Sequence, residues 1–172
     1  YLWARTIPCQ NPTCNAEIPL IKQFWISKKD GKRIAYRPVV DGENELIEFE
    51  LLHGEELDTA LDSGFDPKDG TVSRADASCP VCEQVTEADD VRRLGREGKM
   101  GERLLVVVLH HPEEVGKKYR LASRSDRRDY RRAKERLEEK VENWSAVEDP
   151  LPDEEPDTED HAVNRLPLYG MP

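Results

Sequence analysis

Two short stretches of sequence decide the fold: CQNPTC at residues 9–14 and CPVC at residues 79–82. They contain all four cysteines of the 172-residue chain. Both sulfurs of a pair can face one ion, at about 2.3 Å, only if the loop between them turns tightly. The proline in each loop suits such a turn, because it fixes φ and removes a backbone donor. The spacing predicts a tetrahedral four-thiolate zinc site held by Cys9, Cys14, Cys79 and Cys82.

Two other uses of the cysteines compete with zinc binding. Disulfides need an oxidising compartment, and no basic-then-apolar leader is visible, so we expect a cytoplasmic protein. A redox role for Cys79 and Cys82 would leave the first pair without a purpose. Iron is a minor variant of the metal interpretation. Because four protein ligands leave no position open for water or substrate, the predicted zinc is structural.

The 64 residues between Cys14 and Cys79 exceed what a compact ribbon needs, so we expect an insert at 18–72 with strands of its own. Alternating apolar residues and Asp-Gly turns predict three antiparallel strands at 18–26, 33–40 and 46–52. One or two helical turns are expected at 55–61, and a short strand at 71–73.

The second half of the chain predicts two helices. One starts at an N-cap Thr86 and runs to about Arg96, and the other starts at Ser123 with Asp126 at the capping-box position. An apolar stripe of 3.6-residue period marks the second helix, and it consists of Tyr130, Ala133, Leu137, Val141 and Trp144. Strands are expected at 104–109 and 119–121.

These elements predict an α+β fold: a zinc-ribbon with an antiparallel β-sheet, two helices and a disordered acidic C-terminal linker. The expected parts are a β-rich zinc-ribbon module at 1–122, a basic amphipathic helix packed on it at 123–145, and an acidic, proline-containing linker at 146–172.

The net charge of -10 argues against non-specific nucleic-acid binding by the whole chain, but the charge is unevenly spread. Residues 1–40 carry seven Lys/Arg and two Asp/Glu, and residues 41–70 carry one and eleven. No apolar run approaches the roughly 20 residues of a membrane span, so no membrane partner is expected. The basic segments hold the candidate nucleic-acid contacts, which are Lys28, Lys29, Lys32, Arg33, Arg127, Arg128, Arg131 and Arg132.

No catalytic constellation is visible. His110 and His111 are neighbours on an expected strand, so their side chains point to opposite faces and cannot chelate one ion together. Acid pairs such as Glu55-Glu56 have no partnering base or nucleophile, and we interpret them as solvated charges.

Several further strings point to one family. YLWART (1–6) runs into the first cysteine pair, and AEIPL (16–20) and FWISKK (24–29) follow it. GTV (70–72) precedes CPVC, and GKMGERL (98–104) precedes the Val106–Val108 strand, after Arg92 and Gly95. LYGM stands at 168–171. The chain resembles, over nearly its whole length, the zinc-ribbon segment of the large adenine-specific DNA methylases that contain a Zn-ribbon, some of them linked to anti-phage systems.

The resemblance implies a longer parent chain whose Rossmann-like part uses S-adenosylmethionine to methylate adenine N6. The family's catalytic motif, Asp/Asn-Pro-Pro-Tyr/Phe, has no match here: Asn11-Pro12 agrees with two positions only, and Cys14 is assigned to zinc. No glycine-rich methyl-donor loop is visible either. No catalytic or cofactor-binding residue is therefore carried over, and S-adenosylmethionine is expected only in the parent protein.

The leading hypothesis is a non-catalytic, zinc-binding module of a DNA adenine methyltransferase, which contacts DNA or braces the catalytic domain of the same chain. The alternative is a zinc-ribbon that docks on another protein and has no nucleic-acid role, which the acidic 41–70 block favours. An independent redox or hydrolytic enzyme would need a reducible disulfide or an open metal position.

Overall fold

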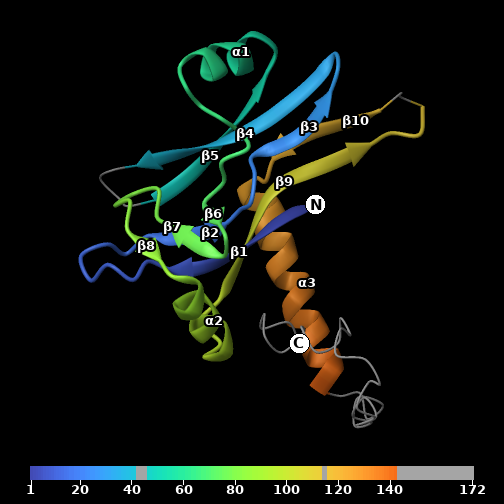
Figure 1. Cartoon of the computed structure of the whole chain (residues 1–172). Coiled ribbons are helices and arrows are strands. Elements are labelled where there is room, and N and C mark those ends of the chain that lie inside the picture. Colours follow the sequence, from blue (N-terminus) through green and yellow to red (C-terminus); the bar gives the residue numbers. More distant parts are fainter. Residues whose placement is uncertain (42–45, 114–115, 143–172) are drawn as a thin grey trace, which may run out of the picture.

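A computed structural model describes residues 1–41, 46–113 and 116–142 of the chain. Within these residues the fold is α+β, with three antiparallel sheets and three helices (Figure 1). The expected α+β class and antiparallel strands are confirmed. The expected count of two helices is wrong, because α1 (Gly54–Asp62) forms a third where one or two helical turns were expected. Its buried Leu57 and Ala60 pack against a sheet, which stabilises a segment too short to be helical alone.

The largest sheet has four strands in the order β10-β9-β1-β2. The expected strands at 104–109 and 119–121 are confirmed as β9 (Gly101–His110) and β10 (Lys117–Leu121). The sequence interpretation missed β1 (Leu2–Pro8), which lies between β9 and β2 (Glu17–Leu20). Because β1 ends one residue before Cys9, this sheet carries the first cysteine pair at its edge.

A second sheet contains β3 (Trp25–Lys29), β4 (Lys32–Asp41) and β5 (Leu46–His53). The strands expected at 33–40 and 46–52 are confirmed, but the single strand expected at 18–26 is wrong. The chain leaves the first sheet after β2 and enters the second at β3. Between them the N–H of Ile21 donates to Thr71 Oγ1 at 2.9 Å, and the N–H of Phe24 donates to the carbonyl of Pro67 at 2.7 Å.

The third sheet is small and carries the second cysteine pair. It contains β6 (Val72–Ser73), β7 (Asp76–Ser78) and β8 (Val85–Thr86). Thr86 was expected to cap a helix, but it lies in β8 opposite Ala77, and α2 begins at Ala88 and ends at Arg96. The Asp76 carboxylate accepts the N–H of Ala88 at 2.9 Å, so a strand residue satisfies the helix start that Thr86 was expected to cap.

The third helix, α3 (Arg124–Glu142), starts as expected. The N–H of Ser123 donates to the Asp126 carboxylate at 2.8 Å, and the N–H of Asp126 donates to Ser123 Oγ at 3.2 Å, which confirms the capping box. Arg120 also pairs with Asp126 at 2.6 Å. Residues 143–145 of the expected helix, and the expected linker at 146–172, lie outside the described residues.

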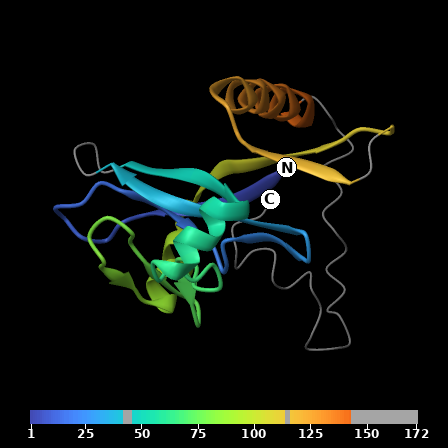
Figure 2. The ribbon, with the colours of Figure 1, turned by 90° about the horizontal axis from the view of Figure 1, so that it is seen from above.

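The buried side chains form four hydrophobic clusters, and α3 lies outside them. Figure 2 shows α3 as an outer layer over β9 and β10, with α2 and the small sheet at the opposite edge of the molecule. No residue of α3 is buried. The helix is held by Tyr130, whose ring lies 4.2 Å from that of Trp3, and by Lys134, which donates to Glu102 at 2.6 Å. No helix in the described part of the chain combines the length and the apolar character that a bilayer crossing requires.

Candidate metal centre

Two backbone turns present the four cysteines. The turn between β1 and β2 is closed by the N–H of Cys9, which donates to the carbonyl of Ala16 at 2.9 Å, and by the N–H of Cys14, which donates to that of Asn11 at 3.0 Å. The turn between β7 and β8 is closed in the same way by Cys79 and the carbonyl of Gln84 at 2.9 Å. The two hairpins, 65 residues apart from Cys14 to Cys79, therefore point their sulfurs toward each other.

The distances between the sulfurs fit one tetrahedral ion. Cys9 Sγ lies 3.6 Å from Cys82 Sγ, Cys14 Sγ lies 3.9 Å from Cys79 Sγ, and all four atoms lie within 4.8 Å of one another. Four sulfurs at about 2.3 Å from a central zinc would be about 3.8 Å apart. A disulfide requires about 2.05 Å, and all four cysteines are free thiols. The arrangement therefore matches a metal tetrathiolate and does not match a pair of disulfides.

The surroundings of the site are closed and apolar. Cys14 is 5% exposed and Cys79 is 1% exposed, and both pack in a cluster with Ile7, Ile18 and Leu94. Cys9 and Cys82 are half-buried at its edge. A metal ion held by all four sulfurs would have no open position for a substrate. Such a closed ligand set is typical of structural zinc sites.

Burial and backbone dipoles divide the charge unevenly among the thiols. Burial raises the pKa of the Cys9 thiol to about 12. The backbone N–H of Gln84, two residues after Cys82, lowers the pKa of that thiol to about 7. In the same way, the backbone N–H of Asn11 acts to lower the pKa of the Cys9 thiol, and the N–H of Ala16 acts to lower that of Cys14. These amides favour the thiolate form, and a divalent ion would complete the ionisation of the cluster.

The four basic residues predicted on the first hairpin to contact nucleic acid do not all lie on one surface. Lys28, Lys29 and Lys32 line one groove between the β3–β4 hairpin and the β9–β10 hairpin. Arg33 forms an ion pair with Asp58 of α1 instead. The structure therefore brings three of these four side chains together.

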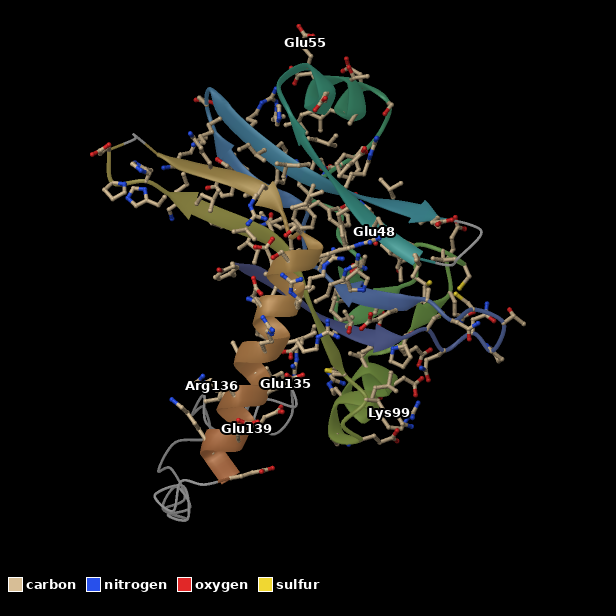
Figure 3. All side chains as sticks on the ribbon, turned by 180° about the vertical axis from the view of Figure 1, so that it is seen from behind. Glu48, Glu55, Lys99, Glu135, Arg136 and Glu139 are labelled. Atoms are coloured by element: carbon tan, nitrogen blue, oxygen red, sulfur yellow. The ribbon has the colours of Figure 1, made fainter. Side chains whose placement is uncertain are left out.

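The basic residues of α3 lie elsewhere. Arg127 lies 3.9 Å from the Glu48 carboxylate of β5, which Arg103 of β9 also contacts at 3.0 Å, and Figure 3 shows Glu48 beside the start of α3. Arg128 lies 3.7 Å from Asp129. Arg131 and Arg132 are exposed. Part of this predicted surface is thus used in holding the helix to the sheets.

Three residues that sequence reasoning did not select share the groove with the lysines: His110, Lys117 and Tyr119. The Lys117-Lys118 pair was visible in the sequence, next to an expected strand. No local sequence pattern predicts that the β3–β4 hairpin approaches a hairpin 85 residues further along the chain.

Among the described residues, the cysteine cluster is the one group of three or more His, Cys, Asp or Glu side chains close enough to hold a metal ion. Comparisons with protein-family models, with curated proteins and with solved structures found no match to this chain.

Proposed function

We propose that this chain is a zinc-stabilised, non-catalytic module of an S-adenosylmethionine-dependent DNA adenine (N6) methyltransferase, and that it contacts DNA or braces the catalytic domain. The observation that carries the proposal is the set of sulfur–sulfur distances, 3.6 and 3.9 Å, from two separate hairpins. Four thiolates in a tetrahedron favour zinc over harder metals, and two facing hairpin turns are the arrangement of a zinc ribbon.

The methyltransferase context rests on the sequence. It is supported by the strings YLWART, FWISKK and GKMGERL around the two cysteine pairs, and by the lack of any catalytic motif in a segment that the family would use as a structural part. The coding sequence on both sides tests this context. We expect the reading frame to continue on both sides, with an Asp-Pro-Pro-Tyr motif upstream. A start codon directly before residue 1 together with a stop codon directly after residue 172 would contradict this context.

A DNA role is supported by the exposed basic side chains of the β3–β4 hairpin and of α3, which can contact phosphates without reading bases. We expect the purified full chain to bind a DNA duplex at low salt. The logarithm of the binding constant should fall linearly with the logarithm of the salt concentration, because each phosphate contact releases a counterion. A fluorescence-anisotropy titration at two or more salt concentrations measures this slope. The lack of binding at low salt would remove the DNA role.

Docking on a protein is the second candidate, because α3 carries apolar side chains that nothing covers within the described residues. Leu137 is 60% exposed and Val141 is 42% exposed. Trp3 and Leu2 of β1 are exposed as well. A chain that binds no DNA at low salt but forms a stable complex with the separately purified catalytic domain of the parent protein would favour this candidate.

A further inference from the structure

We propose that the groove between the β3–β4 and β9–β10 hairpins is the main contact of this chain with the phosphate backbone of duplex DNA. This inference rests on the DNA role proposed above and assigns that role to one surface. The groove has a volume of about 540 Å³, and its lining includes Lys28, Lys29, Lys32, His110, Lys117 and Tyr119.

Lys32 joins the two hairpins, and Ile26 and Tyr119 pack against the same hydrophobic cluster. The ammonium of Lys32 donates to the backbone carbonyl of Lys117 and lies 5.8 Å from the centre of the Tyr119 ring. This contact connects the second sheet to β10, the outer strand of the four-stranded sheet, and so holds the two sides of the groove together. Because Lys32 is partly buried and held on both sides, the groove is part of the fold rather than a chance approach of two surface loops.

The charge of the lining is of one sign. Among the described residues that line the groove, four are lysines, one is a histidine and none is an acid. Among the residues that the structure describes, the ammonium groups of Lys29 and Lys117 have no carboxylate or hydrogen-bond acceptor as a partner. Ammonium groups gathered along a concave surface focus a positive potential, which attracts a polyanion even from a chain of negative net charge.

The basic helix provides a weaker surface. Within Arg124–Glu142, eight basic side chains are interspersed with six acidic ones. Figure 3 shows the alternation on the outer half of the helix, where Glu135 and Glu139 project next to Arg136. Near its start Arg127 faces Glu48, and at its middle Lys134 donates to Glu102. The local field of α3 is therefore largely cancelled, whereas that of the groove is not.

The chemistry of the groove favours the backbone of a duplex over unpaired bases. Lysine is a flexible point charge that pairs with a phosphate, and it lacks the planar fork with which arginine reads guanine. The aromatic rings nearest to the lysines are already covered. Lys28 lies 5.9 Å from the centre of the Trp25 ring, and Lys32 covers Tyr119. Rings occupied in this way are not open platforms for stacking a single strand.

Two double variants of the full chain test the assignment: Lys29→Gln with Lys117→Gln in the groove, and Arg131→Gln with Arg132→Gln on α3 as the matched control. Each removes two positive charges at exposed positions. Titration of a short, fluorescently labelled duplex should show that the groove variant loses affinity and that its log–log salt slope falls by about 2, since each phosphate contact contributes about 0.9. The α3 variant should keep the slope of the original chain. The charge-conserving variant Lys29→Arg with Lys117→Arg should keep binding.

The outcomes separate this inference from the broader proposal. If the log–log salt slope falls in the α3 variant and is unchanged in the groove variant, the groove assignment is overturned while the DNA role stands. If the original chain does not bind duplex at low salt, the DNA role itself fails. Tighter binding of a single strand than of the duplex, lost in the groove variant, would overturn the choice of duplex. Equal metal content and circular dichroism in all variants would exclude misfolding as the cause.

Discussion

Replacement of Cys14 by serine should release the metal and unfold the part of the chain that surrounds it. Cys14 is buried among Ile7, Ile18 and Leu94, and its sulfur lies 3.9 Å from that of Cys79 in the other hairpin. A serine hydroxyl does not replace a thiolate ligand. Structural zinc binds small peptides with about 10–16 kcal/mol, and whole domains are stable by about 5–15 kcal/mol, so loss of the metal removes a large share of the stability.

Thermal unfolding followed by circular dichroism measures this effect. A chelator should lower the Tm of the original chain toward that of Cys14→Ser, and added zinc should restore the original chain but not the variant. Ser78→Ala is the control, because Ser78 is exposed and adjoins Cys79, a proposed ligand, without contributing a sulfur. An unchanged Tm in Cys14→Ser, or in the presence of the chelator, would show that the sheets do not depend on a metal.

Replacement of Gly70 by alanine should be the most damaging change outside the cysteines. A Cβ at Gly70 would overlap the carbonyl oxygen of Ile21 and would lie 2.5 Å from the carbonyl carbon of Lys22. Both are backbone atoms. The Ile21 carbonyl accepts the N–H of Val72 at 3.0 Å, so it cannot move away without straining that bond. We expect a loss of about 3 kcal/mol, which lowers the Tm by roughly 10 °C.

Gly31→Ala is the matched control for this change. A Cβ at Gly31 meets no atom within 4 Å, and its φ of +70° costs alanine only about 1 kcal/mol. Thermal unfolding of both variants under the same conditions compares the two effects. Equal Tm values for the two variants would show that the close approach of Gly70 to Ile21 does not exist in solution.

Most of the regular elements could be predicted from local sequence. Alternating apolar residues and Asp-Gly turns located β4 and β5, and the capping pair Ser123 and Asp126 located the start of α3. The spacing of the cysteines selected the four residues that the fold brings together. These signals succeed because turns, caps and metal knuckles depend on residues only a few positions apart.

The remaining features depend on distant contacts. The break between β2 and β3 is held by Thr71, 50 residues after Ile21, and no pattern around Ile21 indicates it. The residues around Thr86 match the pattern of a helix N-cap, but Thr86 pairs with Ala77 in a sheet. The apolar stripe of α3 predicted a packed face, yet among its described residues Tyr130 stacks on Trp3 while Leu137 and Val141 stay exposed.

Native mass spectrometry of the purified chain tests the account most directly. It reports the mass of the folded protein, and denaturation in the presence of a chelator reports the mass of the chain alone. We predict one zinc ion per folded chain, with its mass offset by the protons that the thiols release on binding, and four free thiols after denaturation. A folded chain without metal, or one whose mass is lowered by the hydrogens lost in disulfide formation, would contradict a metal centre that joins the two hairpins.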